Sequence, residues 1–157
     1  MLREPSCEDE DARRVHRELQ QLTHERIAHT NRIGALLVLH NPRPRIVIGG
    51  RDGAVWWDRR RDQVPPMLRA EIEREGARLK LVREQVRAVK AERCKELAEG
   101  KQPLVAHLAR LRAIGPKGAW VLVKEVFGWR HFANRREPAS SLGLVPTHLV
   151  SSVHVDA

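Results

Sequence analysis

Apolar positions recur at alternating steps of four and three residues along two long stretches of the chain. In residues 12–40 the series is Val15, Leu19, Leu22, Arg26, His29, Ile33, Leu36 and His40, with apolar ends and a polar middle. In residues 66–99 the series is Leu68, Ile72, Glu75, Leu79, Val82, Val86, Val89 and Arg93. This spacing places each series on one side of an α-helix. The pattern therefore predicts two long helices, and the first would be about 45 Å long at the usual rise per residue.

The residues between these two stretches interrupt the helical pattern. Asn41-Pro42, Pro44 and Gly49-Gly50 disfavour a continuous helix and let the chain reverse, so we expect an antiparallel coiled-coil hairpin. The polar seam positions indicate either a loose pair or a larger assembly, and we expect homo-oligomerisation through this arm. Trp56 and Trp57 lie near the reversal, where they either pack against the end of the hairpin or stack on bases.

A third helical pattern, Leu108–Val123, breaks at Ile114-Gly115-Pro116-Lys117-Gly118 and then resumes as an apolar run. Two short helices joined by such a turn have the plan of a helix-hairpin-helix, whose glycines let the backbone approach a ligand and whose second helix favours a phosphate at its start. Gly115 fits the usual motif, whereas Ala113 replaces its first glycine. Lys117 adds a mobile positive charge. The alternative is a purely structural turn between packed helices.

These patterns predict an all-α fold, in which a long antiparallel coiled-coil arm precedes a small helical domain with the helix-hairpin-helix-like turn. The expected segments are a disordered acidic N-terminus at residues 1–11, the arm at residues 12–99, the small domain at residues 104–146 and an irregular tail at residues 147–157. Gly100-Lys101-Gln102-Pro103 is the expected linker between the arm and the small domain.

Four aromatic residues and one capping motif are expected to organise the small domain. Its core is expected to contain Trp120, Phe127, Trp129 and Phe132. Asn134-Arg135-Arg136-Glu137 resembles a capping box that opens a last helix, and Gly143 is expected to end that helix.

The positive charge of the chain is concentrated in the third pattern and just after it. The net charge is +9, and residues Leu108 to Arg136 contain seven Lys or Arg against the single acid Glu125, which gives +6 of that total. Such concentration favours a polyanionic partner, and we expect DNA. The candidate DNA-binding residues are Gly115, Lys117, Gly118, Lys124, Arg130, Arg135 and Arg136.

The sequence gives little support for disulfides, a metal site, a signal peptide or a membrane span. Cys7 and Cys94 are too few and too far apart for a disulfide framework or a thiolate metal site, which indicates a reducing compartment. The histidines of the first helix are not spaced to hold a metal together, so no metal site is expected in this chain. The polar, acidic start and the lack of a long apolar run predict a protein of the cytoplasm, without a signal peptide or membrane span.

Three stretches resemble the DEDD transposases of the insertion-sequence one-ten class, which are related to the Piv and MooV DNA invertases. They are EDEDARRVHRELQQLTHERIAHTNRIGALL, then ERCKEL followed by LRAIGPKGAWVLVKEVFGWRHFANRRE, and finally SSLGLVPT, and together they extend over about residues 8 to 152. In that family a RuvC-like domain with acidic, metal-binding catalytic residues precedes a coiled-coil arm and a C-terminal domain that supplies a nucleophilic serine.

The resemblance implies that this chain holds the arm and the C-terminal domain, without the RuvC-like domain and the divalent metal, such as Mg, that it binds. Ser151 falls at the position of the nucleophilic serine, but Leu149 replaces the family's aromatic residue and Ser152 its glycine. We therefore expect an incomplete, catalytically inactive fragment of a bacterial insertion-sequence transposase, without a cofactor of its own. The resemblance also implies a structured guide RNA as a partner.

Two other classes of function fit parts of the sequence. A non-catalytic nucleic-acid-binding module needs only the turn and its cations, and a structural coiled-coil protein needs only the arm. Salt-dependent DNA binding distinguishes them, because phosphate contacts release counterions.

Overall fold

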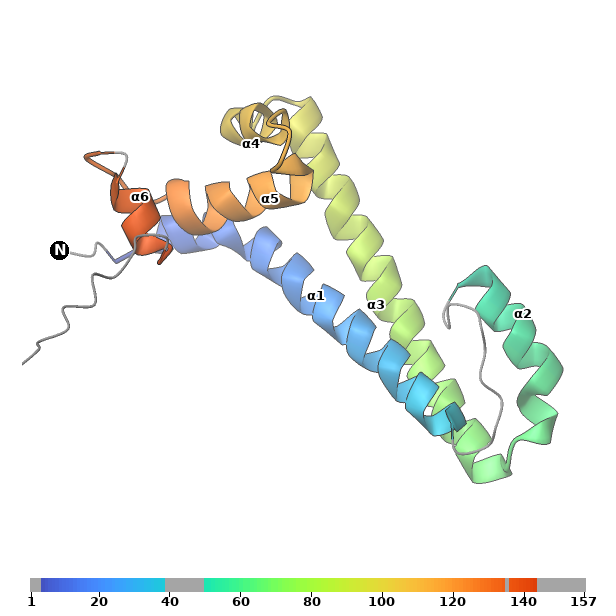
Figure 1. Ribbon diagram of the computed structural model, residues 1–157. Coiled ribbons are helices and arrows are strands. Elements are labelled where there is room, and N and C mark those ends of the chain that lie inside the picture. Colours follow the sequence, from blue (N-terminus) through green and yellow to red (C-terminus); the bar gives the residue numbers. More distant parts are fainter. Residues whose placement is uncertain (1–3, 39–49, 135, 144–157) are drawn as a thin grey trace, which may run out of the picture.

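The computed structural model describes residues 4–38, 50–134 and 136–143, and there it contains helices and no strand (Figure 1). In chain order the elements are α1 (Cys7–Val38), α2 (Arg51–Arg60), the 3₁₀ helix η1 (Arg61–Gln63), α3 (Pro66–Ala98), α4 (Pro103–Ala109), α5 (Gly115–Val121), the π-helix η2 (Leu122–Phe127) and α6 (Arg136–Ser141). The predicted all-α fold class is confirmed for these residues.

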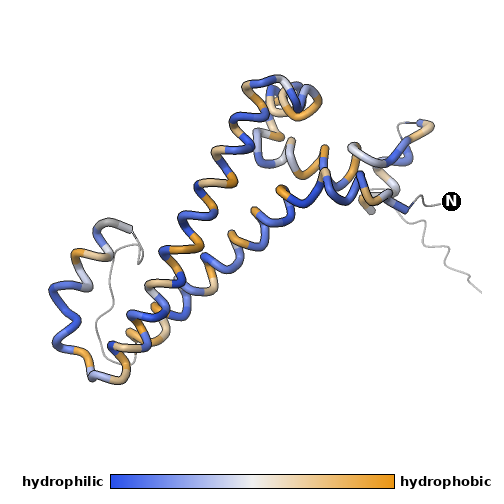
Figure 2. Tube along the Cα trace, turned by 180° about the vertical axis from the view of Figure 1, so that it is seen from behind, coloured by the Kyte–Doolittle hydropathy of each residue, from blue (hydrophilic) through white to orange (hydrophobic). Residues whose placement is uncertain are grey.

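Helices α1 and α3 run antiparallel and pack through the seams that the sequence predicts. The buried residues of α3 are Ile72, Glu75, Leu79, Val82, Val86 and Val89, and each is a predicted seam position. On α1, Leu19, Leu22 and Ile33 are buried as expected. The next seam position differs, because Leu37 is 1% exposed and the predicted Leu36 only packs against its cluster; the last predicted position, His40, lies outside the described residues. Figure 2 shows the resulting hydrophobic residues at intervals along two largely hydrophilic helices.

A layer of polar contacts divides the interface of α1 and α3 into two apolar clusters. One cluster contains Leu19, Leu22, Val82, Val86 and Val89, and the other contains Ile33, Leu37, Val64, Ile72 and Leu79. Between them, His29 Nδ1 lies 2.7 Å from Glu75 Oε2. Arg78 donates a hydrogen bond to the other oxygen of Glu75. The polar positions in the middle of the predicted seams therefore contact each other across the interface.

The N-terminal end of α1 extends further than the sequence suggests. The helix begins at Cys7, so the expectation of a disordered acidic segment is wrong for residues 7–11. Ser6 and Asp9 form a reciprocal cap in which the Asp9 amide donates to Ser6 Oγ at 3.1 Å and the Ser6 amide donates to Asp9 Oδ2 at 2.9 Å. This cap satisfies amides of the first turn, and the acids after it favour the positive end of the helix dipole.

At the end where the chain reverses, the expected connection contains helix α2, which the sequence pattern does not predict. Trp56 and Trp57 pack against the cluster of Ile33, Leu37 and Ile72. The sequence leaves both packing against the end of the hairpin and stacking on bases open for the tryptophan pair, and the structure supports packing. Residues 39–49, with their proline and glycine breaks, lie outside the described residues.

At their other ends α1 and α3 lie apart, and the C-terminal helices connect them (Figure 1). The chain reverses after α3 at Gly100, whose φ is +70°. Val105, Ala119, Trp120 and Val123 then form a third apolar cluster, against which Leu97 of α3 packs. The linker predicted at Gly100-Lys101-Gln102-Pro103 is therefore a tight corner, and the small helical unit packs back onto the arm.

The core of this small unit matches the prediction only at Trp120. Phe127 and Phe132 contact each other edge to face, with ring centroids 6.0 Å apart, outside the buried cluster. The capping box before α6 is confirmed, since Asn134 Oδ1 accepts from the Glu137 amide at 3.2 Å and Glu137 Oε2 accepts from the Ala133 amide at 2.9 Å. Gly143, with φ +68°, follows the end of this helix as expected.

Candidate nucleic-acid interface

The turn between α4 and α5 places a lysine at the surface beside a glycine with a left-handed backbone. Gly115 has φ +60°, a conformation that favours glycine, and it begins α5. Gly118 packs in the first turn of α5, where an added Cβ would lie 3.2 Å from Ile114 Cγ2. Lys117 is exposed. The helix-hairpin-helix assignment stays a prediction. The structure places Lys117 at the surface in the first turn of α5.

Two cations flank the indole ring of Trp120, which is 4% exposed. The guanidinium carbon of Arg93 lies 4.0 Å from the ring centroid, and Lys124 Nζ lies 5.7 Å from it. Burial lowers the pKa of both side chains, and the charge of Glu96 opposes the effect in each case. Cation–π attraction offsets part of the cost of this burial.

A cavity of about 660 Å³ lies between α1, α3 and α5, and the charged side chains of its largely apolar lining are all cationic. The charged and titratable side chains that line it are Arg26, Lys90, Arg93, Lys117, His16 and His24. No aspartate or glutamate lines the cavity in the described part of the chain. The structure thus brings the predicted Lys117 together with cations of both long helices.

An ionic cluster fastens η2 to the start of α1. Glu125 accepts a hydrogen bond from Arg13, and its Oε1 atom lies 3.7 Å from Arg17 Nε and 4.0 Å from His16 Nε2. Burial alone would raise the pKa of Glu125, but the hydrogen bond and charge of Arg13 outweigh it and leave this pKa below its usual value. The π-helical turn contributes to this arrangement, because it carries Glu125 toward Arg13 and Lys124 toward Trp120.

The chain matches one curated sequence over nearly all its length. It is similar to a named transposase. That relative is "Putative transposase y4rJ" of Sinorhizobium fredii (strain NBRC 101917 / NGR234), and the two are 38% identical over 166 aligned positions. The alignment extends over 94% of this chain and 40% of the relative, so the chain spans less than half of the transposase's length. No protein-family model and no solved structure matches the chain.

The other predicted DNA-binding residues lie away from Lys117. Arg130 stacks on Trp129, with its guanidinium carbon 4.4 Å from the ring centroid, and Arg136 is exposed at the start of α6. Helical rise places Lys117 and Arg130 about 20 Å apart, at opposite ends of α5 and η2. Arg135 and the predicted nucleophile Ser151 lie outside the described residues. The predicted cations are therefore not gathered into one site in the described part of the chain.

Three residues of the cationic cavity escaped the sequence prediction. Arg26 and Arg93 are seam positions of the two long helices, and Lys90 is an exposed neighbour on α3. The sequence did contain a sign of this cavity, namely an arginine at a seam position of each long helix. A charged side chain at such a position needs either an anion or open space opposite it. His16, one of the histidines of the first helix for which no metal role was expected, is 3% exposed.

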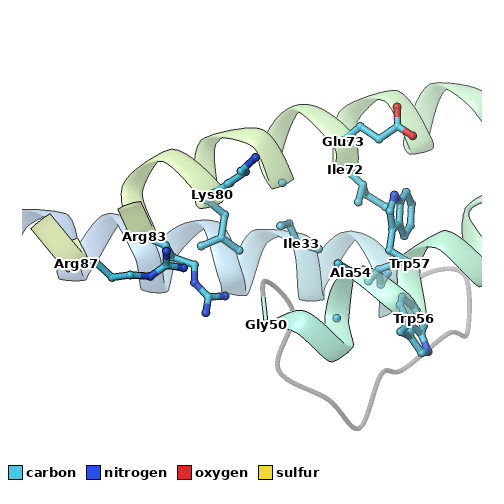
Figure 3. A pocket seen from close by; sticks show the side chains of 14 residues that line it. Ile33, Gly50, Ala54, Trp56, Trp57, Ile72, Glu73, Lys80, Arg83 and Arg87 are labelled. Atoms are coloured by element: carbon cyan, nitrogen blue, oxygen red, sulfur yellow. The ribbon is translucent and has the colours of Figure 1, made fainter. Parts of the chain in front are cut away.

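A second cavity, of about 360 Å³, belongs to the packed end of the arm. Ile33, Ile72, Trp56 and Trp57 line it, and Arg83 of α3 lies along its side (Figure 3). Its walls are mainly those of the apolar cluster already described, and we assign no ligand to it. Among the described residues, no group of three His, Cys, Asp or Glu side chains is placed to hold a metal ion, and no helix has the length and apolar character of a membrane span.

Proposed function

We propose that this chain acts in DNA transposition, as the arm and C-terminal DNA-binding part of a transposase of the insertion-sequence one-ten class. The observation that carries the proposal is the similarity to a named transposase over 94% of the chain. The three stretches that resemble the one-ten class support the finer assignment.

The distribution of charge supports DNA as the partner. Lys117 and Arg136 are exposed, and Lys124 and Arg130 are half-buried against tryptophan rings. Cations of this kind contact phosphate oxygens without reading bases, so we expect binding that depends weakly on sequence and strongly on salt.

The remaining parts of the proposal rest on the resemblance. Ser151 is the proposed nucleophile, and the divalent metal of the family belongs to its RuvC-like domain. Because a serine needs activation before it attacks DNA, we propose that the chain by itself binds DNA without cleaving it. A structured guide RNA and self-association through α1 and α3 complete the set of proposed partners.

Fluorescence anisotropy of the purified chain with a short labelled duplex tests DNA binding. With about five phosphate contacts, log K against log salt should have a slope near −4 to −5. Changing Lys117, Arg135 and Arg136 together to alanine should bring that slope closer to zero by about 2 to 3. Affinity that does not change with salt would refute the proposal, and light scattering that then shows a stable dimer would favour a structural coiled-coil protein.

A further inference from the structure

We propose that the cavity between α1, α3 and α5 holds a backbone phosphate of bound DNA, and that Arg26 and Lys90 of the arm contact it together with Lys117. This inference rests on the proposed function and extends it, because it assigns DNA contacts to the two long helices. The arm would then be part of the DNA-binding surface as well as a support for the C-terminal helices.

The absence of a carboxylate among its described lining residues distinguishes this cavity from the other charged parts of the interface between α1 and α3. Elsewhere along the interface carboxylates accompany the cations: Arg13 and Arg17 pair with Glu10 and Glu125, Arg32 and Arg78 pair with Glu75, and Glu73 lines the second cavity beside Lys80, Arg83 and Arg87. At the cavity, none of Arg26, Lys90, Arg93 and Lys117 forms an ion pair within the described part of the chain. Like charges around one hollow repel each other, and an anion in that hollow would relieve the repulsion.

A buried histidine, His16, forms part of the cavity wall. Gln20 Nε2 lies 3.1 Å from His16 Nε2. Because an amide nitrogen only donates, His16 Nε2 accepts this bond and the ring proton of the neutral imidazole lies on Nδ1. Nδ1 is buried and has no hydrogen-bond partner among the described residues. Burial, followed by the charge of Arg93, lowers the pKa of His16 and favours this neutral form. His16 therefore belongs to the wall of the cavity, and the phosphate contacts are assigned to Arg26, Lys90 and Lys117.

The geometry favours a phosphate over a nucleobase. Arg93 lies over the indole ring of Trp120 and Lys124 lies near it, so the ring is not free as a stacking platform. Arg26, Lys90 and Lys117 are exposed, and they can follow a sugar-phosphate backbone that passes over the opening. The cavity volume of about 660 Å³ lies in the range of pockets that hold small molecules, which is ample for one phosphodiester unit.

The double variant Arg26→Gln with Lys90→Gln tests this assignment. A matched control is Arg14→Gln with Arg74→Gln, which removes two positive charges from exposed positions of the same helices, away from the cavity. Anisotropy with the labelled duplex is measured between about 50 and 200 mM salt. The cavity variant should bring the slope closer to zero by about 2, so that the loss of affinity over this salt range becomes about tenfold smaller. The control should keep nearly the wild-type slope.

The possible outcomes separate this inference from the proposed function. If the wild-type chain binds DNA with a steep slope and the cavity variant behaves like the control, the cavity assignment is wrong and the proposed function stands. If the wild-type chain shows no salt-dependent binding, the proposed function itself is wrong. The substituted side chains are exposed, so circular dichroism should show unchanged helix content and melting in both double variants.

Discussion

Replacing Glu75 with glutamine tests whether one buried carboxylate holds the two long helices in register. Glu75 is 2% exposed. It accepts hydrogen bonds from His29 and Arg78, and its Oε1 atom lies 3.5 Å from Arg32 Nε. Glutamine preserves the size of the side chain and removes its charge, so the substitution isolates the electrostatic contribution to packing.

The expected loss of stability follows from the charged hydrogen bonds that the glutamine side chain cannot make. A hydrogen bond to a charged group contributes about 1.5–3 kcal/mol, and removing one partner of a buried ion pair costs about 3–5 kcal/mol. The NH₂ group of the glutamine is a hydrogen-bond donor, and it would face His29 and Arg78, which donate hydrogen bonds to Glu75 in the wild-type protein. Since the layer is only two helices thick and water is near, we expect the free energy of unfolding to fall by about 2–3 kcal/mol, or roughly 4–12 °C in melting temperature.

The same substitution should change the dependence of stability on pH. The hydrogen bond from His29 is the largest cause that holds the pKa of Glu75 below its ordinary value of 4.5; burial opposes it, and Arg78 and Arg32 add to it. A carboxylate with a lowered folded-state pKa stabilises the protein above its unfolded pKa, and this stabilisation is lost as pH falls through the folded pKa. The difference between wild type and Glu75→Gln should therefore be full at neutral pH and shrink at acidic pH below 4.5.

Urea and thermal unfolding followed by circular dichroism measure both effects. Glu71→Gln is the matched control, because Glu71 pairs with Arg32 at 3.1 Å with both side chains exposed, and such pairs contribute about 0–1 kcal/mol. A Glu75→Gln variant as stable as the control at neutral pH would refute the reasoning. So would a loss of stability that stays the same in acid.

Four further substitutions test other parts of the structure. Gly128→Ala should lower the free energy of unfolding by about 1–3 kcal/mol, because an added Cβ would lie 2.6 Å from the Val123 carbonyl oxygen. Gly34→Ala, where nothing lies within 4 Å, should raise it by about 0.5–1 kcal/mol. A higher melting temperature for Gly128→Ala would contradict the first prediction, and a lower one for Gly34→Ala would contradict the second. Glu125→Gln should release η2 from α1, which hydrogen exchange would detect as faster exchange in η2 with an unchanged rate near α2; equal rates in η2 would argue against the ionic anchor. Trp57→Ala should reduce stability by about 1–3 kcal/mol, below the value for full burial, and leave DNA affinity unchanged, whereas lost affinity at unchanged stability would favour base stacking.

The two long helices were predictable because their packing depends on local periodicity. Leu79 and Val82 lie on the seam simply by their spacing, and no distant contact is needed to place them there. The start of α1 and helix α2 were harder, since each depends on a particular contact. The Ser6–Asp9 cap extends α1 to Cys7, and the packing of Trp56 and Trp57 on the arm accompanies a helix that a break-rich sequence conceals.

The candidate site was predictable only in part, because it forms where α1 and α3 move apart. Lys117 stood out through the Gly-Pro turn beside it, whereas Arg26 and Arg93 looked like imperfections of the two seams. The structure separates two kinds of polar seam residue. His29 and Glu75 interrupt the apolar seams but form a hydrogen bond with each other across the interface. Arg26 and Arg93 instead line a cavity that contains no described carboxylate. Burial lowers the pKa of Arg93 in the free protein, and an anionic ligand in that hollow is the compensation that the DNA-binding proposal supplies.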